Sequence, residues 1–186
     1  MGHEYVSNLR RWDVLSGLAK DICAETLVEV GCKEGRTTGF VLENCPNLRV
    51  TAVDPWAPVT NSAEDYSNWD YQAIEAEFWK NVGAHRDRCH MLRALSLEAA
   101  NMLRTRHLDI VFIDAGHDYE NALADIKAWW PLVREGGYLC GHDYQHKFPG
   151  VMRAVAASFP LMRVAVCPDS VWVVQKERDL ALKAAA

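Results

Sequence analysis

The sequence predicts an α/β fold in which a mostly parallel sheet carries helices on both faces and ends in an antiparallel hairpin. Short β-type apolar runs alternate with segments of helical periodicity along most of the chain, and this alternation is typical of βαβ units. Near the C-terminus, two such runs, at 163–167 and 171–175, are separated by only three residues. This short spacing predicts a hairpin, and one of these strands should therefore run antiparallel to its neighbours.

The expected elements follow from the periodicity of the apolar residues. Apolar side chains recur at helical spacing in residues 5–23, which predicts one amphipathic helix at the start of the chain. The parallel strands are expected at 27–30, 49–53, 90–92, 108–114 and 137–141, and the helices between them at 37–43, 95–103, 121–132 and 151–159. With 186 residues, the chain is expected to form one domain.

One segment, residues 55–82, interrupts the alternation with a dense set of aromatic side chains. Two prolines predict a loop at its start, and residues 70–81 have the character of a helix. One interpretation is that the aromatic rings pack this insert onto the sheet. The other is that they form a lid or wall beside a ligand, since ligands bind at the carboxyl ends of the strands in α/β sheets. The sequence leaves both interpretations open.

The composition narrows the classes of function. A net charge of −5 and the lack of a basic cluster argue against a nucleic-acid partner, and no apolar run reaches membrane-spanning length. The six cysteines are scattered without a Cys-x-x-Cys pair, and the N-terminus does not resemble a signal peptide. Reduced thiols and a cytoplasmic location are therefore expected.

The most informative motif is a glycine-containing turn between the first expected strand and the helix that follows it. Gly31 and Gly35 form a Gly-x-x-x-Gly spacing, and Glu29 lies two positions before the first glycine. Glycine lets the backbone approach a ligand closely, and the start of a helix favours a negatively charged group. The spacing differs from the Gly-x-Gly-x-x-Gly of dinucleotide-binding proteins. The turn therefore predicts a nucleotide-shaped cradle of another kind.

Asp54 ends the second expected strand, about one βα unit after the glycine turn. A carboxylate at this place can accept hydrogen bonds from both ribose hydroxyls of an adenosine ligand. Aspartate before Pro55 is also common as a simple turn residue, and we favour the ribose interpretation because of its place in the fold. Trp56 is a weaker candidate for stacking near an adenine ring.

Acidic and imidazole side chains follow the fourth and fifth expected strands. Asp114 ends the fourth strand, and His142 and Asp143 end the fifth, so adjacent parallel strands would bring the three to one edge. Two carboxylates and an imidazole can bind a divalent cation that lowers the pKa of a bound hydroxyl. His117, three residues after Asp114, is a second candidate, because an imidazole can take the proton from an acceptor hydroxyl.

Taken together, these motifs resemble class I S-adenosylmethionine (SAM) methyltransferases. The stretches 112–120, 125–132, Gly136-Gly137 and 142–144 look like the small cephamycin- and macrolide-tailoring enzymes, which are grouped with the catechol-type, metal-dependent O-methyltransferases. The resemblance covers about residues 26–175 and implies a Rossmann-like methyltransferase fold. The expected division of the chain is an N-terminal helix packing on the core at 1–25, a SAM-binding domain at 26–177 that contains the aromatic insert at 55–82, and a tail at 178–186.

The resemblance also implies which residues bind the cofactor SAM. The acidic residue and the glycine turn hold its methionine end, Asp54 its ribose, and the segment after the third strand its adenine. The expected cofactor-binding residues are Glu29, Gly31, Gly35, Thr37, Asp54, Pro55, Trp56, Ala94, Leu95, Ser96 and Asp114. Ser96 is equally well placed to be the N-cap of the next helix.

A metal site and a catalytic base are implied in the same way. Asp114 and Asp143 match two of the three acidic Mg²⁺ ligands of such enzymes, and His142 replaces the third. The carboxylates suit Mg²⁺, which prefers oxygen ligands, whereas the imidazole suits Mn²⁺. Either Mg²⁺ or Mn²⁺ is therefore expected at Asp114, His142 and Asp143. The catechol-type relatives place a lysine base where this chain has His117, so His117 and Asp143 are the expected catalytic residues.

The expected function is transfer of a methyl group from SAM to a hydroxyl of a small molecule, assisted by a divalent metal. A metal-independent O- or N-methyltransferase that uses His117 as its base is the alternative within the same fold. Two alternatives of another class are an NAD-dependent oxidoreductase and a non-catalytic SAM- or nucleotide-binding module. The expected partner is a small hydroxylated acceptor, with no nucleic acid and no membrane, and the sequence leaves a homo-oligomer open.

Overall fold

The computed structural model describes residues 8–59 and 67–177. Within these residues seven strands form one sheet in the order β3-β2-β1-β4-β5-β7-β6. The strands are β1 (Thr26–Val30), β2 (Arg49–Asp54), β3 (Cys89–Arg93), β4 (Leu108–Ile113), β5 (Val133–Gly141), β6 (Ala165–Cys167) and β7 (Val171–Gln175). Strands β1 to β5 are parallel to one another, whereas β7 runs antiparallel to both β5 and β6. The predicted parallel sheet with its C-terminal hairpin is confirmed.

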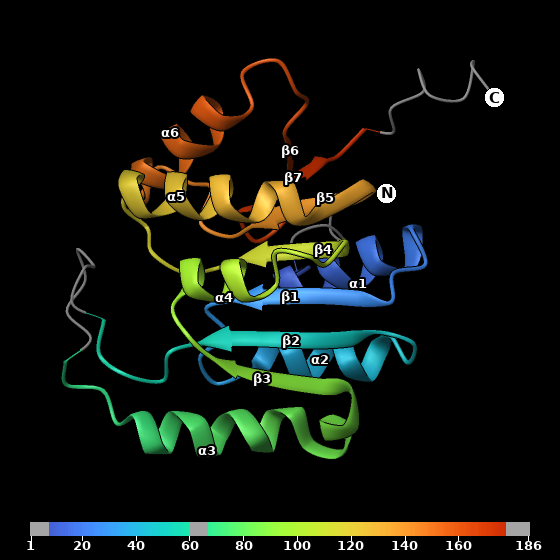
Figure 1. The fold of residues 1–186 in the computed structure, drawn as a ribbon, viewed down its shortest axis with the longest axis vertical. Helices are drawn as coiled ribbons and strands as arrows, with labels where there is room; N and C mark the ends of the chain where they lie inside the picture. Colours follow the sequence, from blue (N-terminus) through green and yellow to red (C-terminus); the bar gives the residue numbers. More distant parts are fainter. Residues whose placement is uncertain (1–7, 60–66, 178–186) are drawn as a thin grey trace.

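Helices cover both faces of this sheet (Figure 1). They are α1 (Arg11–Asp21), α2 (Arg36–Asn44), α3 (Tyr71–Val82), α4 (Ser96–Met102), α5 (Tyr119–Trp129) and α6 (Pro149–Ser158), with 3₁₀ turns η1 (Gly83–Arg88) and η2 (Trp130–Leu132). Buried side chains of α1, α2 and α3 share one core cluster, and those of α4, α5 and α6 share another. Figure 1 shows α4 and α5 in front of the sheet and α1 and α2 behind it.

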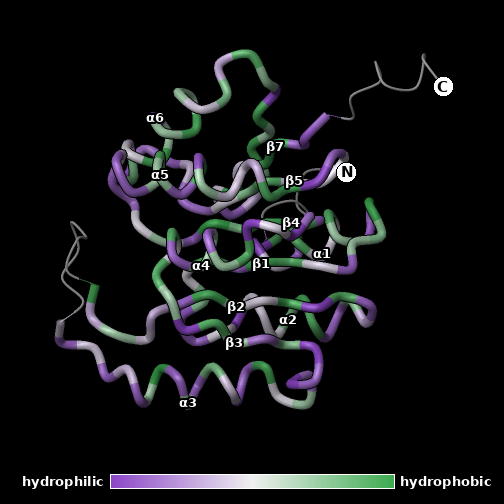
Figure 2. The backbone as a smooth tube through the Cα atoms, in the orientation of Figure 1, coloured by the Kyte–Doolittle hydropathy of each residue, from purple (hydrophilic) through white to green (hydrophobic). Residues whose placement is uncertain are grey.

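The two cores explain why the sequence folds in this way. The central strands are buried on both faces, so they read as nearly continuous apolar runs. The helices bury one side only, and Figure 2 shows the resulting alternation of hydrophobic and hydrophilic residues along α3. In that helix Phe78 and Val82 are buried.

The first helix begins later than the periodicity predicts. It starts at Arg11, and of the expected residues 5–10, residues 5–7 lie outside the described part of the chain. The backbone N–H of Arg10 donates to the carboxylate of Asp13 at 2.9 Å, which caps the helix at this point. Leu9, which the periodicity places on the apolar face, is 44% exposed. The local cap therefore decides the boundary against the hydrophobic pattern.

The other boundaries differ by smaller amounts. The fifth strand begins at Val133, four residues earlier than expected, and the helix expected at 121–132 ends at Trp129 and continues as a 3₁₀ turn that contains Pro131. All six cysteines are free. Within the described residues, no helix is both long enough and apolar enough to cross a membrane.

Candidate active site

The candidate site is a cleft of about 620 Å³ at the carboxyl ends of the central strands. The chain runs outward from β1 through β2 to β3 on one side and through β4 to β5 on the other, so the strand order reverses between β1 and β4. Ligands of α/β sheets bind at this switch point. The volume lies in the range of small-molecule sites. Expected cofactor-binding residues that line the cleft are Glu29, Gly31, Thr37, Asp54, Pro55, Ala94, Leu95, Ser96 and Asp114.

At Gly31 the turn after β1 lies directly against the end of β4, between the two sides of the cleft. Its φ is +85°, and a Cβ atom at this position would lie 2.1 Å from the carbonyl oxygen of Asp114. No side chain fits there, so only glycine lets the turn after β1 pass against the end of β4. The backbone N–H of Gly31 donates to Val53, and that of Asp114 donates to Val30, both at 2.8 Å. Asp114 is thereby held next to the glycine turn.

Glu29 lies under the turn and is almost completely buried. The hydroxyl of Thr38, in the first turn of α2, donates a hydrogen bond to its carboxylate. Burial raises the pKa of Glu29 to about 8, against the opposing effect of the Thr38 hydrogen bond. The site therefore holds an acid whose charge would be favoured by a positively charged ligand.

Asp54 holds the glycine turn as well as bordering the cleft. Its two carboxylate oxygens accept the backbone N–H groups of Lys33 at 2.9 Å and of Trp56 at 2.8 Å. Burial raises the pKa of Asp54, while these two hydrogen bonds act in the opposite direction. Each oxygen of a carboxylate can accept a second hydrogen bond, so a ribose is compatible with this arrangement.

Two expected cofactor residues do not line the cleft. The Trp56 side chain is 4% exposed, its indole N–H donates to the carbonyl of Lys33 at 3.1 Å, and its ring packs edge-on against Phe78 at 5.2 Å. A Cβ atom on Gly35 would lie 2.5 Å from the same Phe78 ring. Both residues therefore pack the turn against α3, and adenine stacking by Trp56 has no support in the geometry.

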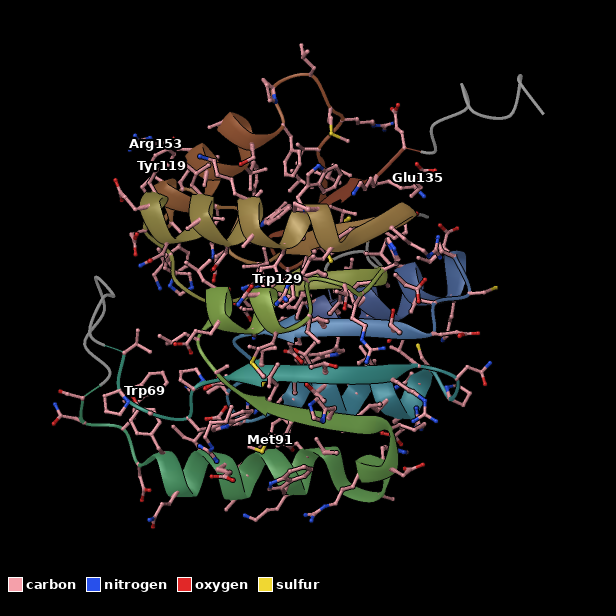
Figure 3. The ribbon with its side chains drawn as sticks, viewed as in Figure 1. Trp69, Met91, Tyr119, Trp129, Glu135 and Arg153 are labelled. Atoms are coloured by element: carbon pink, nitrogen blue, oxygen red, sulfur yellow. The ribbon has the colours of Figure 1, made fainter. Side chains whose placement is uncertain are left out.

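The aromatic insert combines the two interpretations that the sequence left open. Phe78 is fully buried in the core, whereas Trp69 and Tyr71 line the cleft. Figure 3 shows Trp69 on the same side of the molecule as the carboxyl ends of the strands. The ammonium group of Lys33 lies 4.1 Å from the centre of the Trp69 ring. Tyr66 lies outside the described residues.

The adenine end of the expected site contains a buried acid that sequence reasoning missed. Ser96 is the first residue of α4 rather than its N-cap, and its hydroxyl accepts the indole N–H of Trp129 at 3.0 Å. Asp125 lines the cleft near it, and burial raises the pKa of this carboxyl to about 6. Asp125 falls on the buried side of the predicted helix, which is the only local signal that it has.

The other end of the cleft gathers side chains from the ends of β4 and β5. Ile113 of β4 pairs with Gly141 of β5, so Asp114 and His142 follow side by side. Asp114, His117, His142 and Asp143 all line the cleft. The sequence predicted this grouping because parallel strands end at a common edge.

His117 and Asp143 form a close pair. The Nε2 atom of His117 lies 2.7 Å from Asp143 Oδ2, and its ring stacks on Phe148 with the ring centres 4.3 Å apart. Asp143 has a positive φ of 61°, and the N–H of the next residue, Tyr144, donates to the carbonyl of Ser170. Although burial acts to raise it, the hydrogen bonds from His117 and His142 hold the pKa of Asp143 well below its usual range.

His142 lies between the two carboxylates. Its Nδ1 atom is 3.2 Å from Asp143 Oδ1 and 3.6 Å from Asp114 Oδ1. Burial acts to lower the pKa of His142, but the hydrogen bond to Asp143 and the charge of Asp114 outweigh it and raise this pKa.

Arg11, which sequence reasoning missed, completes the site. Its Nη1 atom lies 2.8 Å from Asp114 Oδ2 and 3.1 Å from His142 Nδ1. This arginine is 103 residues from Asp114 in the sequence and begins α1, an element predicted only to pack on the core. The sequence contains no local signal for this contact.

The expected metal ligands are already engaged with one another. Among the described residues, the group of ligand atoms that lie within 4.8 Å of one another consists of Asp114, His117 and Asp143, with His117 in the place expected for His142. In that group His117 is hydrogen-bonded to Asp143, and Asp114 is paired with Arg11. The donor types suit a divalent ion, but Asp114 Oδ2 and Asp143 Oδ2 are already paired with Arg11 and His117.

Comparison with known proteins identifies the family to which this chain belongs. A family model described as a methyltransferase domain matches residues 28–144. An uncharacterised protein of Acanthamoeba polyphaga mimivirus is 26% identical over 136 residues. That match covers 70% of this chain but only 57% of the viral protein.

Solved structures with similar folds share little sequence with this chain. The O-methyltransferase NovP has a TM-score of 0.67 at 19% identity, with 90% of this chain and 80% of NovP covered. An O-methyltransferase from Bacillus cereus in complex with S-adenosylhomocysteine (SAH) has a TM-score of 0.61 at 17% identity, covering 91% and 83%. The SAH-bound methyltransferase PaMTH1 of Podospora anserina has a TM-score of 0.63 at 17% identity, covering 90% and 78%. These likenesses establish the Rossmann-like methyltransferase fold.

Proposed function

The chain belongs to the methyltransferase-domain family, and from this premise we propose that it transfers the methyl group of SAM to a hydroxyl of a small molecule. One observation carries the proposal. A single cleft is lined by Glu29 and Asp54 near its β1–β2 end and by the His117–Asp143 pair near its β4–β5 end. A cofactor pocket and a proton acceptor in one cleft are the two parts that methyl transfer to a hydroxyl requires.

At the cofactor end, the chain supplies acceptors and a close backbone approach. Glu29 and the turn at Gly31 would hold the methionine portion of SAM, and Asp54 would accept the ribose hydroxyls through the lone pairs that its two backbone hydrogen bonds leave. The buried carboxyl of Glu29 suits a cationic ligand, because a positive charge beside it would favour its ionised form.

At the acceptor end, the His117–Asp143 pair supports general-base catalysis. With its Nε2–H donated to Asp143, the imidazole of His117 has Nδ1 as its proton acceptor. Asp143 stays ionised, fixes this tautomer and stabilises the imidazolium that forms when His117 takes the proton of the acceptor hydroxyl. Bound SAM supplies an electrophilic methyl group on its sulfonium. The protein therefore needs to align the acceptor and remove one proton.

The cofactor half of this proposal is tested by calorimetric titration of SAH into the protein. We expect micromolar binding, weakened about tenfold or more in Asp54→Asn, which loses one charged acceptor. Asp87→Asn is the matched control, because Asp87 is exposed beside the start of β3. No binding of SAH by folded protein would contradict the proposal.

Metal assistance is a second candidate, favoured by the cluster of Asp114, His117 and Asp143. Methyl transfer that is lost on chelation and restored by Mg²⁺ or Mn²⁺ would support it.

The protein would be a non-catalytic binding module if SAH binds but no acceptor among hydroxylated small molecules is methylated. The N-acceptor alternative is tested in the same screen with amines.

A further inference from the structure

The unexpected feature of the acceptor end is the cation that α1 brings into it. We propose that the guanidinium of Arg11 is a built-in cation of this site, which replaces the divalent metal that the resemblance implies. The role at the acceptor end rests on the proposed function, whereas the charge arrangement itself does not.

Three of the four carboxylate oxygens of Asp114 and Asp143 have a close partner, whereas the contact of Asp114 Oδ1 is with His142 Nδ1 at 3.6 Å. Arg11 contacts Asp114 Oδ2, His117 contacts Asp143 Oδ2, and His142 lies beside Asp143 Oδ1 at 3.2 Å. The amide of Gln145 adds a weaker contact to Asp143 Oδ1 at 3.3 Å. A divalent ion that used Asp114 Oδ2 and Asp143 Oδ2 would have to displace the guanidinium and break the His117–Asp143 hydrogen bond. These close contacts therefore form without an ion, although the buried Arg11 Nε and His142 Nε2 atoms have no hydrogen-bond partner among the described residues.

The position of Arg11 is supported at both ends of its helix. The backbone N–H of Arg11 donates to Asp169 Oδ2 at 3.0 Å, in the turn between β6 and β7. At the other end of α1, the hydroxyl of Tyr138 in β5 donates to Asp21 at 2.7 Å. Between them Leu15 and Ala19 are buried in the core. The helix is therefore anchored at both ends, and the contact with Asp114 places the guanidinium in the cleft without a ligand.

The charges favour an arginine or a metal, but not both. Asp114 and Asp143 place two carboxylates at one edge, and like charges this close are costly unless a cation lies with them. Arg11 supplies that cation, and it would repel a divalent ion at the same site. If Arg11 is removed, Asp114 loses its guanidinium partner, and the pair of carboxylates should then bind a divalent ion more tightly.

Arg11 also lines the cleft, and its side chain is 30% exposed. A guanidinium beside the acceptor's oxygen would stabilise the negative charge that develops as the hydroxyl loses its proton, which is the task that a metal performs in the related enzymes. Lysine is a poorer substitute for the planar guanidinium but keeps the charge.

The test is Mn²⁺ binding, followed by calorimetry and by the electron paramagnetic resonance of free Mn²⁺, with and without SAH. The wild type is expected to bind Mn²⁺ no more tightly than millimolar, and Arg11→Met at least tenfold more tightly. Arg11→Lys should bind like the wild type, because it keeps the charge. Arg10→Met is the matched control, since Arg10 is an exposed neighbour whose guanidinium lies 3.8 Å from Asp169.

Micromolar Mn²⁺ binding by the wild type, or no gain in Arg11→Met, would overturn the inference. If Arg11→Met does not fold, the same comparison is made with Arg11→Gln, and the wild-type titration alone still decides against the inference if it shows tight binding. SAH binding separates the two proposals. If SAH binds and the Mn²⁺ prediction fails, only the inference is lost. If SAH does not bind, the proposed function fails whatever Mn²⁺ does.

Discussion

The two ends of the cleft are built in different ways. The centre of the proposed cofactor end comes from one short stretch of chain: β1, the glycine turn and the end of β2, tied by the backbone hydrogen bonds of Asp54. The acceptor end combines side chains from α1, β4, β5 and the loops that follow these strands, held by ion pairs.

This difference indicates which substitutions should disturb each end of the cleft. Backbone geometry controls the cofactor end, so it depends on glycines and on buried packing. Mutual charge satisfaction controls the acceptor end, so removing one member leaves another charge without its partner. Substitutions at the two ends should therefore separate binding, stability and catalysis.

The largest effect is expected for His117→Ala, which tests whether the acceptor end carries the chemistry. Loss of the base should lower kcat about 100-fold to 10,000-fold while SAH affinity is unchanged. The measurement is the initial rate of methyl transfer to an acceptor identified by screening. His146→Ala, on the exposed part of the loop after β5, is the control and should keep full activity. An unchanged kcat in His117→Ala would remove His117 from the mechanism.

Gly31→Ala tests whether the two ends are physically joined. Its Cβ would collide with the Asp114 carbonyl, and its φ is unfavourable for alanine, so we expect a loss of about 3 kcal/mol in the free energy of unfolding. Urea denaturation measures it. Gly17→Ala in α1 is the matched control, because nothing lies within 4 Å of its added Cβ and alanine favours a helix. Equal stability of the two variants would contradict the close approach of β1 and β4.

The pH dependence of stability tests the buried acid at the cofactor end. Burial raises the pKa of Glu29 in the folded protein from its ordinary value of 4.5 to about 8, so its contribution to stability is full below pH 4.5 and is lost as the pH rises through 8. Between pH 6 and 7.5 the wild type should lose about 2 kcal/mol relative to Glu29→Gln, measured by urea denaturation. Glu25→Gln, exposed before β1, should follow the wild type. Parallel curves for the wild type and Glu29→Gln would show that Glu29 is ionised in the folded protein.

The smallest effect is expected for Trp69→Ala, in the part of the aromatic insert that borders the proposed cofactor end. Trp69→Ala removes an exposed ring that lines the cleft and lies under Lys33, so SAH affinity should fall by about fivefold with unfolding unchanged. Phe78→Ala, in the same insert, should instead destabilise the fold by about 3–5 kcal/mol, because Phe78 is fully buried. The insert would be packing alone if Trp69→Ala changed neither SAH affinity nor acceptor KM.

Much of the fold was predictable because it is encoded locally. The apolar runs of β1 and β4 identify buried parallel strands, and the short spacing before β7 identifies the hairpin. The glycine turn and the acids at the strand ends were also readable, because a parallel sheet brings the ends of its strands to one edge. His117 and Asp143 were expected together for this reason, and the structure brings them to 2.7 Å. Their catalytic roles remain predictions.

Only the tertiary structure decided the parts that depend on contacts between distant segments. Trp56 looked like a ligand contact in the sequence and proved to be core, because α3 returns to place Phe78 against it. The sequence by itself determined the strands, the glycine turn and the acidic edge, since these follow from periodicity and backbone geometry within a few residues. Arg11 and Asp169 have no such local signature, because their places depend on how α1 and the β6–β7 turn dock on the finished sheet.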